Sequence, residues 1–263
     1  MARASKALAK AKSGSTGTSL ATIDAELNTE VANLKNQIGA PSGNKIKIDA
    51  TGDIVLPDGQ SLGNEIQVAV VNFASRNLFY ASAYNPNNIV PPDCYAMGSE
   101  RHDFLQPEDD SPDKQADKCG GCPLNAFGSG NGGIGKACQN RYYVAVVVVD
   151  PDNPDAAGAL DAPIYLLDLS PSNLKSFEGA IRAATGALGH WAKAQYTVSA
   201  KNAGTYAKVS WLDPEPNPYY AVHYARRAEV ESILFRKPDF SQKDNTPKRG
   251  RAPARRAAAP ARR

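Results

Sequence analysis

Four cysteines constrain this chain more than any other feature of its sequence. Cys94 precedes a tight Cys119-Gly-Gly-Cys122 segment by twenty-four residues, and Cys138 follows that segment after another fifteen. Two cysteines separated by two glycines can form a knuckle that presents both thiolates to one tetrahedral zinc ion. The glycines would leave backbone N–H groups free to point at the sulfur atoms. The sequence therefore predicts one zinc ion bound by Cys94, Cys119, Cys122 and Cys138.

Two other uses of the cysteines stay open at this point. Two disulfides would suit an oxidising compartment, but the chain begins without the apolar core of a signal peptide. A redox-active pair would need a thioredoxin-like strand and helix around Cys119 and Cys122, which the surrounding pattern does not indicate. Four thiolates would fill the coordination sphere of zinc, so a structural role is expected rather than a catalytic one. His102 is an alternative ligand to Cys94, or else a solvated side chain of an acidic loop.

The apolar segments are too short for a membrane span. The longest unbroken run, residues 144–149, has six residues, and 22% of the chain is charged. We therefore expect a protein of the cytoplasm with no membrane partner.

Charge is distributed unevenly along the chain. Residues 1–12 carry +4 and residues 243–263 carry +7, so a total of +3 leaves −8 for residues 13–242. Of this, −5 falls on residues 100–117, an acidic segment between the first two cysteines. An acidic body with two basic ends is typical of tails that bind a polyanion, although such tails can also serve solubility alone.

Composition and periodicity divide the chain into four parts. Residues 1–18 resemble a flexible basic arm, residues 44–236 a folded domain, and residues 237–263 a disordered basic tail. Between them, residues 19–38 predict a helix, because apolar side chains recur at steps of three and four residues. This helix either packs on its own domain or pairs two chains as a short coiled coil in a homo-oligomer. Its apolar positions are Leu20, Ile23, Leu27, Val31, Leu34 and Ile38.

The folded domain is predicted to be α+β and mainly β. Helices are expected from Ser170 to about residue 188 and from Asn217 to about residue 235, and a hairpin turn is expected at Arg76-Asn77. Many short strands with one helix inserted among them favour a five-stranded, OB-like barrel, with a C-terminal helix. The expected strands are residues 45–48, 66–73, 78–80, 142–149, 164–167, 196–199 and 205–212.

The residues around the cysteines resemble a group of four-cysteine proteins encoded by tailed bacteriophages. The resemblance rests on Pro91-Pro-Asp-Cys-Tyr95, on residues 119–129, and on Gly135-Lys-Ala-Cys-Gln-Asn-Arg141. It covers roughly residues 45–236. It implies an OB-like fold with a zinc insertion over residues 91–140, and single-stranded DNA binding in phage DNA replication or recombination, in the host cell cytoplasm. Phage proteins of this function commonly end in an acidic, partner-recruiting tail, whereas this chain ends in a basic one.

Aromatic and basic residues that alternate on strands are typical of single-strand binding, because rings stack on bases and cations neutralise phosphates. In residues 205–211, alternation places Tyr206 and Lys208 on one face and Trp211 on the other. Tyr206 is alternatively a half-buried barrel residue and Lys208 a solvated charge. The further candidates, for DNA or RNA, are Arg76, Phe79, Tyr80, Arg141, Tyr143, Tyr196 and Lys201 on strands, and Arg249, Arg251, Arg255 and Arg256 in the tail.

Two other functional classes were considered. An enzyme is not expected, because the glycine-rich residues 128–136 lack the Ser or Thr that follows lysine in a phosphate loop. The three histidines also form no catalytic constellation. The remaining alternative is a structural or regulatory nucleic-acid-associated protein, nucleoid-like or polymerase-modifying, that acts through its coiled coil and tails.

Overall fold

The computed structural model describes residues 44–83, 85, 90–204, 206–212 and 214–240. The chain divides into two units, Met1–Gly43 and Asn44–Arg263, and every described residue belongs to the second. The arm at 1–18, the helix expected at 19–38 and the tail from residue 241 onward lie outside the described residues.

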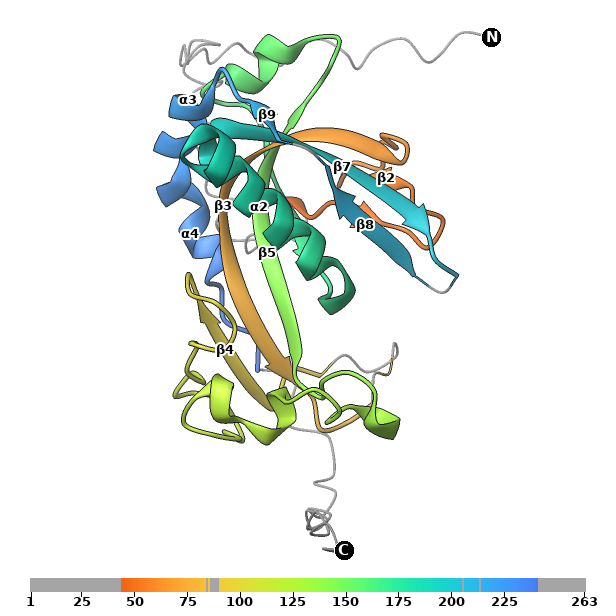
Figure 1. Ribbon diagram of the computed structural model, residues 1–263, viewed down its shortest axis with the longest axis vertical. Coiled ribbons are helices and arrows are strands. Elements are labelled where there is room, and N and C mark those ends of the chain that lie inside the picture. Colours follow the sequence, from red (N-terminus) through yellow and green to blue (C-terminus); the bar gives the residue numbers. More distant parts are fainter. Residues whose placement is uncertain (1–43, 84, 86–89, 205, 213, 241–263) are drawn as a thin grey trace, which may run out of the picture. The chain divides into compact units, whose positions relative to one another are not determined.

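One long strand organises the main sheet (Figure 1). β3 (Glu65–Phe79) pairs antiparallel with β5 (Gln139–Val149) over most of its length. Its first residues also pair with β7 (Ala194–Asn202), and its last five pair with β4 (Cys94–Gly98). A register shift between Val70 and Asn72 marks a bulge, which bends β3. The far end of β3 therefore lies between two different strands, β4 and β5.

The remaining strands extend the sheet without closing it. β6 (Ile164–Leu169) lies beyond β5, β8 (Ala207–Trp211) lies beyond β7, and the short β9 (Glu215–Pro216) pairs with the start of β7. β1 (Lys47–Ile48) and β2 (Ile54–Val55) form a separate two-stranded sheet.

The predicted class, α+β and mainly β, is confirmed, but the expected closed barrel is wrong. Among the described strands, β6 and β8 end the seven-stranded antiparallel sheet on opposite sides and do not pair with each other. Two side chains at the start of the helical segment between β6 and β7 occupy the outer edge of β8 instead. The backbone N–H of Val209 donates to Oδ1 of Asn173 at 3.1 Å, and that of Trp211 donates to Oγ of Ser176 at 2.7 Å. These hydrogen bonds satisfy groups that a closed barrel would pair with another strand.

The hairpin expected at Arg76-Asn77 is also wrong, because β3 runs straight through both residues. Two adjacent polar residues between apolar runs are typical of a turn. Here Arg76 pairs across the sheet with Arg141, and Asn77 with Asn140. Both polar side chains are buried and find partners far away in the sequence, which the local pattern could not reveal.

Helices cover both faces of the sheet. α2 (Leu174–Leu188) follows a 3-10 turn at Pro171–Asn173, as the Ser170-Pro171 signal predicted, and ends at Gly189, whose φ is +80°. The C-terminal helix is split in two, α3 (Tyr220–Ala225) and α4 (Arg227–Leu234). None of the described helices combines the length and the apolar composition needed to span a membrane.

Two apolar cores result from this arrangement. On the α2 side, Phe177 packs its ring against Phe73, Tyr142 and Trp211, with centroid distances of 4.8–5.2 Å. On the other side, Val230 and Leu234 of α4 cover small and β-branched residues of β3 and β5. Burial on both faces explains why the run 144–149 is wholly apolar.

His223 of α3 is a buried, neutral histidine. It is fully buried, its Nδ1 lies 3.0 Å from Nδ2 of Asn217, and its Nε2 lies 2.7 Å from the carbonyl oxygen of Ala157. A ring nitrogen facing a carbonyl must donate, so Nδ1 is left to accept from Asn217. Burial lowers the pKa of His223 below its ordinary value of 6.5.

We predict that His223 makes the fold less stable as the pH falls below about 6.5. The unfolded chain binds a proton at that pH, whereas the buried ring does not, so protonation favours unfolding by up to about 1.4 kcal/mol per pH unit. An NMR titration of the His223 ring should show a midpoint below 6.5. A midpoint at or above 6.5 would show that the ring is not held neutral by burial.

Candidate metal centre and nucleic-acid interface

The sheet places two of the cysteines at the same end of β3. Cys94 opens β4 directly opposite Phe79, the last residue of β3. Cys138 immediately precedes β5 on the other side of β3, where Gln139 pairs with Leu78. Neighbouring strands lie roughly 4.8 Å apart, so Cys94 and Cys138 flank the end of β3 from its two sides. Both cysteines therefore lie at the ends of strands that pair with β3.

The other two cysteines lie in a compact knuckle of two 3-10 turns, Cys119–Gly121 and Pro123–Asn125. The N–H of Cys119 donates to the carbonyl of Leu105 at 3.0 Å, and that of Cys138 donates to the carbonyl of Leu124 at 2.9 Å. At Gly120 a Cβ atom would stand 2.6 Å from the carbonyl oxygen of Asp103, so only glycine fits. Hydrogen bonds therefore fix the knuckle next to Cys138.

The N–H of Gly121 does not point at sulfur, contrary to the expectation for the knuckle glycines. The N–H groups of Gly121 and Cys122 donate instead to the carbonyls of Lys118 and Cys119, each at 3.3 Å. This 3-10 bonding closes the turn locally. Other polar groups act to lower the thiol pKa: the backbone of Gln115 and the side chain of Ser111 at Cys94, and the side chain of Asn77 at Cys119.

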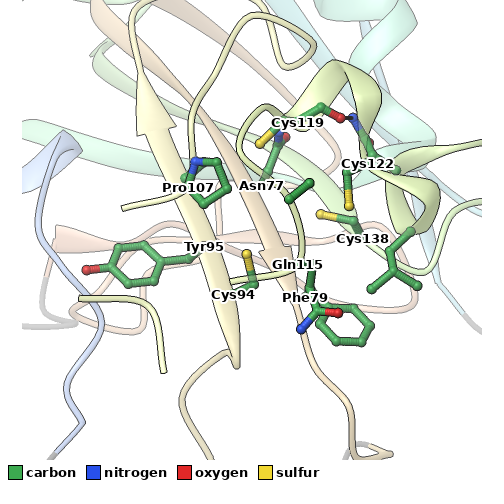
Figure 2. Close-up of a pocket in the computed structure, with 13 residues that line it drawn as sticks. Asn77, Phe79, Cys94, Tyr95, Pro107, Gln115, Cys119, Cys122 and Cys138 are labelled. Carbon is green, nitrogen blue, oxygen red and sulfur yellow. Dashed lines mark hydrogen bonds between the residues drawn. The ribbon is translucent and has the colours of Figure 1, made fainter. Parts of the chain in front are cut away.

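All four cysteines line one cavity of about 20 Å³ (Figure 2). Figure 2 shows the four sulfur atoms facing a common space, with Phe79 and Pro107 among the surrounding side chains. A volume of this size holds about one water-sized particle. All four are free thiols. As placed, the sulfur atoms do not form a closed cluster: in the described part of the chain, no three His, Cys, Asp or Glu side chains already stand as a metal-binding group.

The surroundings disfavour thiolates in the absence of a cation. Burial raises the pKa of Cys94 and Cys119, and raises that of Cys138 to about 12, and the negative charges of neighbouring thiolates add to each increase. Lys136 opposes the increase at Cys138 only weakly. The cavity thus collects four sulfur donors whose ionised forms lack a compensating positive charge.

Asn77 connects the cavity to the rest of the sheet. Its Nδ2 donates to the carbonyl of His102 at 2.8 Å, and its Oδ1 accepts from Nδ2 of Asn140. Sequence reasoning missed Asn77 as a site residue, because it appeared to belong to a turn. Asn77 lies two residues before Phe79, which pairs with Cys94. Its nearness to the cysteines becomes visible only when this strand pairing is known.

His102 is neither a lining residue of the cavity nor solvated. Its Nδ1 lies 3.0 Å from Oδ1 of Asn77, and its ring centroid lies 4.6 Å from that of Tyr142. Its Nε2 is buried and has no hydrogen-bond partner among the described residues. Burial lowers the pKa of His102 to about 4. The expectation of a solvated histidine is therefore wrong, and Cys94 lines the cavity while His102 does not.

The acidic segment 100–117 holds the first residues of the C-terminal tail. Nζ of Lys237 lies 2.9 Å from Oδ2 of Asp110 and 3.5 Å from Oε2 of Glu108, and the ring of Phe240 packs on Tyr95 at 5.6 Å. Residues 237–240 are thus held against β4, and the expectation of disorder from residue 237 onward is wrong for these four. Arg249, Arg251, Arg255 and Arg256 lie outside the described residues.

Two of the nucleic-acid candidates are buried and cannot present a surface. Tyr196 is 1% exposed, and its hydroxyl donates to the carbonyl of Trp191 at 2.8 Å. Arg76 is 5% exposed, and its guanidinium lies 4.1 Å from the ring centre of Tyr143 and donates to the carbonyl of Arg236. Tyr196 is a core residue, so its assignment as a stacking platform is wrong. Arg76 is wrong as a phosphate ligand for the same reason.

Other candidates gather around Asp168 on the α4 side of the sheet. Nε of Arg141 and Nζ of Lys45 each lie 2.7 Å from a carboxylate oxygen of Asp168. Tyr143 lies beside this group, and the pKa of Tyr80 is raised by burial and by Tyr143. Arg141 is thus already paired, and the two tyrosines are half-buried next to it. Phe79 instead lines the cysteine cavity.

Three candidates remain together on the hairpin between β7 and β8. Lys201 and Lys208 are exposed and stand directly opposite each other across the two strands. Tyr206, at the turn, is 48% exposed, whereas Val209 and Trp211 are buried, so the predicted alternation is confirmed. In the described part of the chain, neither lysine forms an ion pair. We refer to Lys201, Tyr206 and Lys208 as the hairpin surface.

Comparison with known proteins gives no further guide. No protein-family model, no curated protein and no solved structure matches this chain.

Proposed function

We propose that this chain binds single-stranded nucleic acid, DNA in the first place, as a non-enzymatic binding protein with a structural zinc ion. The observation that carries the proposal is the hairpin surface, where two exposed lysines face each other beside an exposed tyrosine. Like charges directly opposite on paired strands destabilise a sheet. A phosphate between Lys201 and Lys208 would relieve this repulsion, and Tyr206 offers a ring for stacking on a base.

The cysteine cavity supports a structural zinc ion. Four sulfur donors match the tetrathiolate sites that zinc prefers. Polar groups of Asn77, Ser111 and Gln115 act to lower the pKa of two of the thiols, as the polar neighbours of metal-bound sulfur do. Zinc would supply the positive charge that the buried thiolates lack. By holding Cys94, Cys138 and the knuckle together, it would fix β4 and the start of β5 at the end of β3. The sulfur atoms would move inward to reach bonding distance.

The resemblance to four-cysteine phage proteins supports the same function and a role in phage DNA replication or recombination. A relation to the OB-like fold stays a prediction. The proposed binding does not depend on this relation, because it needs only an exposed sheet surface. The basic tail, outside the described residues, would add contacts to phosphates through Arg249, Arg251, Arg255 and Arg256. The structural or regulatory alternative depends wholly on the tails and on residues 19–38.

We predict that Lys201→Ala with Lys208→Ala makes single-strand binding less dependent on salt. Each phosphate contact to a single strand contributes about 0.7 to the slope of log K against log salt, so the slope should become shallower by about 1.4.

Tyr206→Ala should weaken single-strand binding roughly five- to a hundred-fold while leaving duplex binding unchanged, since duplex bases are already stacked. Fluorescence anisotropy of a labelled oligonucleotide over a salt series measures both effects.

Lys175→Ala provides the matched control, because Lys175 is an exposed lysine on α2 and does not belong to the hairpin surface. It should leave both the affinity and the slope unchanged. If the two hairpin lysines behave like Lys175, and Tyr206→Ala binds like the parent, the hairpin surface is not the binding site.

A further inference from the structure

A surface on α3 carries two exposed tyrosines that the sequence reasoning did not single out. Tyr220 and Tyr224 lie one helical turn apart, so their side chains leave the same side of α3. They are 43% and 39% exposed. Each ring has a cation beside it: Nζ of Lys193 lies 5.8 Å from the ring centre of Tyr220, and the guanidinium of Arg227 lies 3.3 Å from that of Tyr224.

Further aromatic rings continue this surface. The ring of His190 stands edge-on to Tyr224 at 5.8 Å and lies 5.0 Å from the ring of Trp191, which in turn packs on Phe73 of β3. Tyr224 is therefore connected to the core through a series of ring contacts, which holds it in place. The α3 surface, as we define it, consists of His190, Trp191, Lys193, Tyr220, Tyr224 and Arg227.

The cations of this surface are not neutralised within the described residues. Neither Lys193 nor Arg227 is among the side chains that form ion pairs there. Nε of Arg227 donates to the carbonyl of Tyr224 at 2.9 Å, and its terminal nitrogens make no hydrogen bond to another described residue.

We infer that the α3 surface is a second contact site for single-stranded nucleic acid, an inference that rests on the proposed function. Tyr220 would stack on a base. Arg227, whose guanidinium lies over the ring of Tyr224, would offer a second surface for stacking. The terminal nitrogens of Arg227 and Nζ of Lys193 would bind phosphates. A duplex offers no unstacked base to these rings. Proteins use the same combination of rings and guanidinium planes wherever they read splayed single strands.

The α3 surface is separate from the hairpin surface. Figure 1 shows α3 beside β9, at the opposite end of β7 from the turn into β8. Lys193 directly precedes β7 and Lys201 lies near its end, so the two lysines are roughly 26 Å apart along the strand at about 3.3 Å per residue. One strand that touches both surfaces must follow β7 over this length. Loss of one surface would therefore leave the other able to bind.

The test combines photo-crosslinking with binding by the full chain. An oligonucleotide of 5-bromouracil and thymine is crosslinked to the parent protein, and the modified peptides are identified by mass spectrometry. Tyr220→Ala with Tyr224→Ala is compared with Tyr220→Phe with Tyr224→Phe, which keeps both rings. We expect crosslinks within residues 219–227 and an affinity loss of roughly five- to a hundred-fold for the alanine variant only. Thermal unfolding of both variants should match the parent, since both rings are partly exposed.

Each failure has a distinct meaning. If the parent binds the oligonucleotide but the alanine variant binds equally well, and crosslinks fall only elsewhere, the α3 surface is not a contact site and the proposed function stands. Equal losses in the alanine and phenylalanine variants would also overturn the stacking role, because the rings would not matter. If the parent itself does not bind, the proposed function fails and this inference fails with it.

Discussion

The purified chain should contain one zinc ion per molecule, and removing it should unfold the segment between β4 and β5. Zinc-finger peptides gain about 10–16 kcal/mol from structural zinc at pH 7. In this larger fold the metal would act on one end of the sheet, so we expect its loss to lower the free energy of unfolding by about 5 kcal/mol. Without zinc, the four thiols surround the cavity with no metal to join their sulfur atoms, and the knuckle keeps its backbone hydrogen bond from Cys138 to Leu124.

Metal analysis of the purified protein and limited proteolysis with and without a chelator measure this effect. Cys119→Ser should behave like the chelated protein and be cut within residues 99–137. Asp117→Asn is the matched control, because Asp117 is an exposed residue of the same segment and is not a proposed ligand. A zinc content near zero with all four thiols free, or the presence of two disulfides, would contradict the zinc assignment.

Phe177→Ala should destabilise the fold by about 3–5 kcal/mol. Phe177 is 1% exposed, and its ring contacts three other rings that belong to β3, β5 and β8. Truncating a buried phenylalanine removes its transfer free energy and leaves a cavity that a ring cluster cannot easily fill. Urea unfolding should show a lower midpoint with an unchanged m value.

The control for this substitution is Lys175→Ala, two residues earlier on the exposed side of α2. It should change the free energy of unfolding by no more than about 0.5 kcal/mol. A Phe177→Ala effect as small as that of Lys175→Ala would mean that α2 does not pack on the sheet as described.

Local signals predicted the parts of this fold whose structure is decided locally. The Ser170-Pro171 pair marked the start of the helical segment, and the apolar run after Arg141 marked a strand buried on both faces. Alternation at Lys208 and Val209 correctly separated an exposed face from a core face. In each case the residues that determine the structure are adjacent in the sequence.

Distant partners decide the parts that the sequence did not predict. Arg76 and Asn77 are accommodated inside a strand because Tyr143, Arg236, His102 and Asn140 surround them in the fold. The sequence alone could not show whether the sheet closes into a barrel, because closure depends on whether β6 and β8 pair with each other. Asn173 and Ser176 instead satisfy backbone N–H groups on the outer edge of β8.

The candidate site was predicted in part. The spacing of the cysteines indicated which residues could share a metal, but not the supporting role of Asn77, since strand pairing creates it. The α3 surface was missed because aromatic candidates were sought on strands alone. The spacing of Tyr220, Tyr224 and Arg227, four and three residues apart in an expected helix, was a usable signal.

The binding of the parent chain to a single strand and to its duplex tests the central claim most directly. Labelled oligonucleotides of the same sequence, single-stranded and double-stranded, are titrated with the zinc-loaded chain at about 50 and 200 mM salt, the range over which phosphate contacts are revealed. We expect tighter binding of the single strand at both concentrations, because only unpaired bases can stack on Tyr206 and Tyr220. No binding at the lower salt, or equal binding of strand and duplex, would contradict this claim.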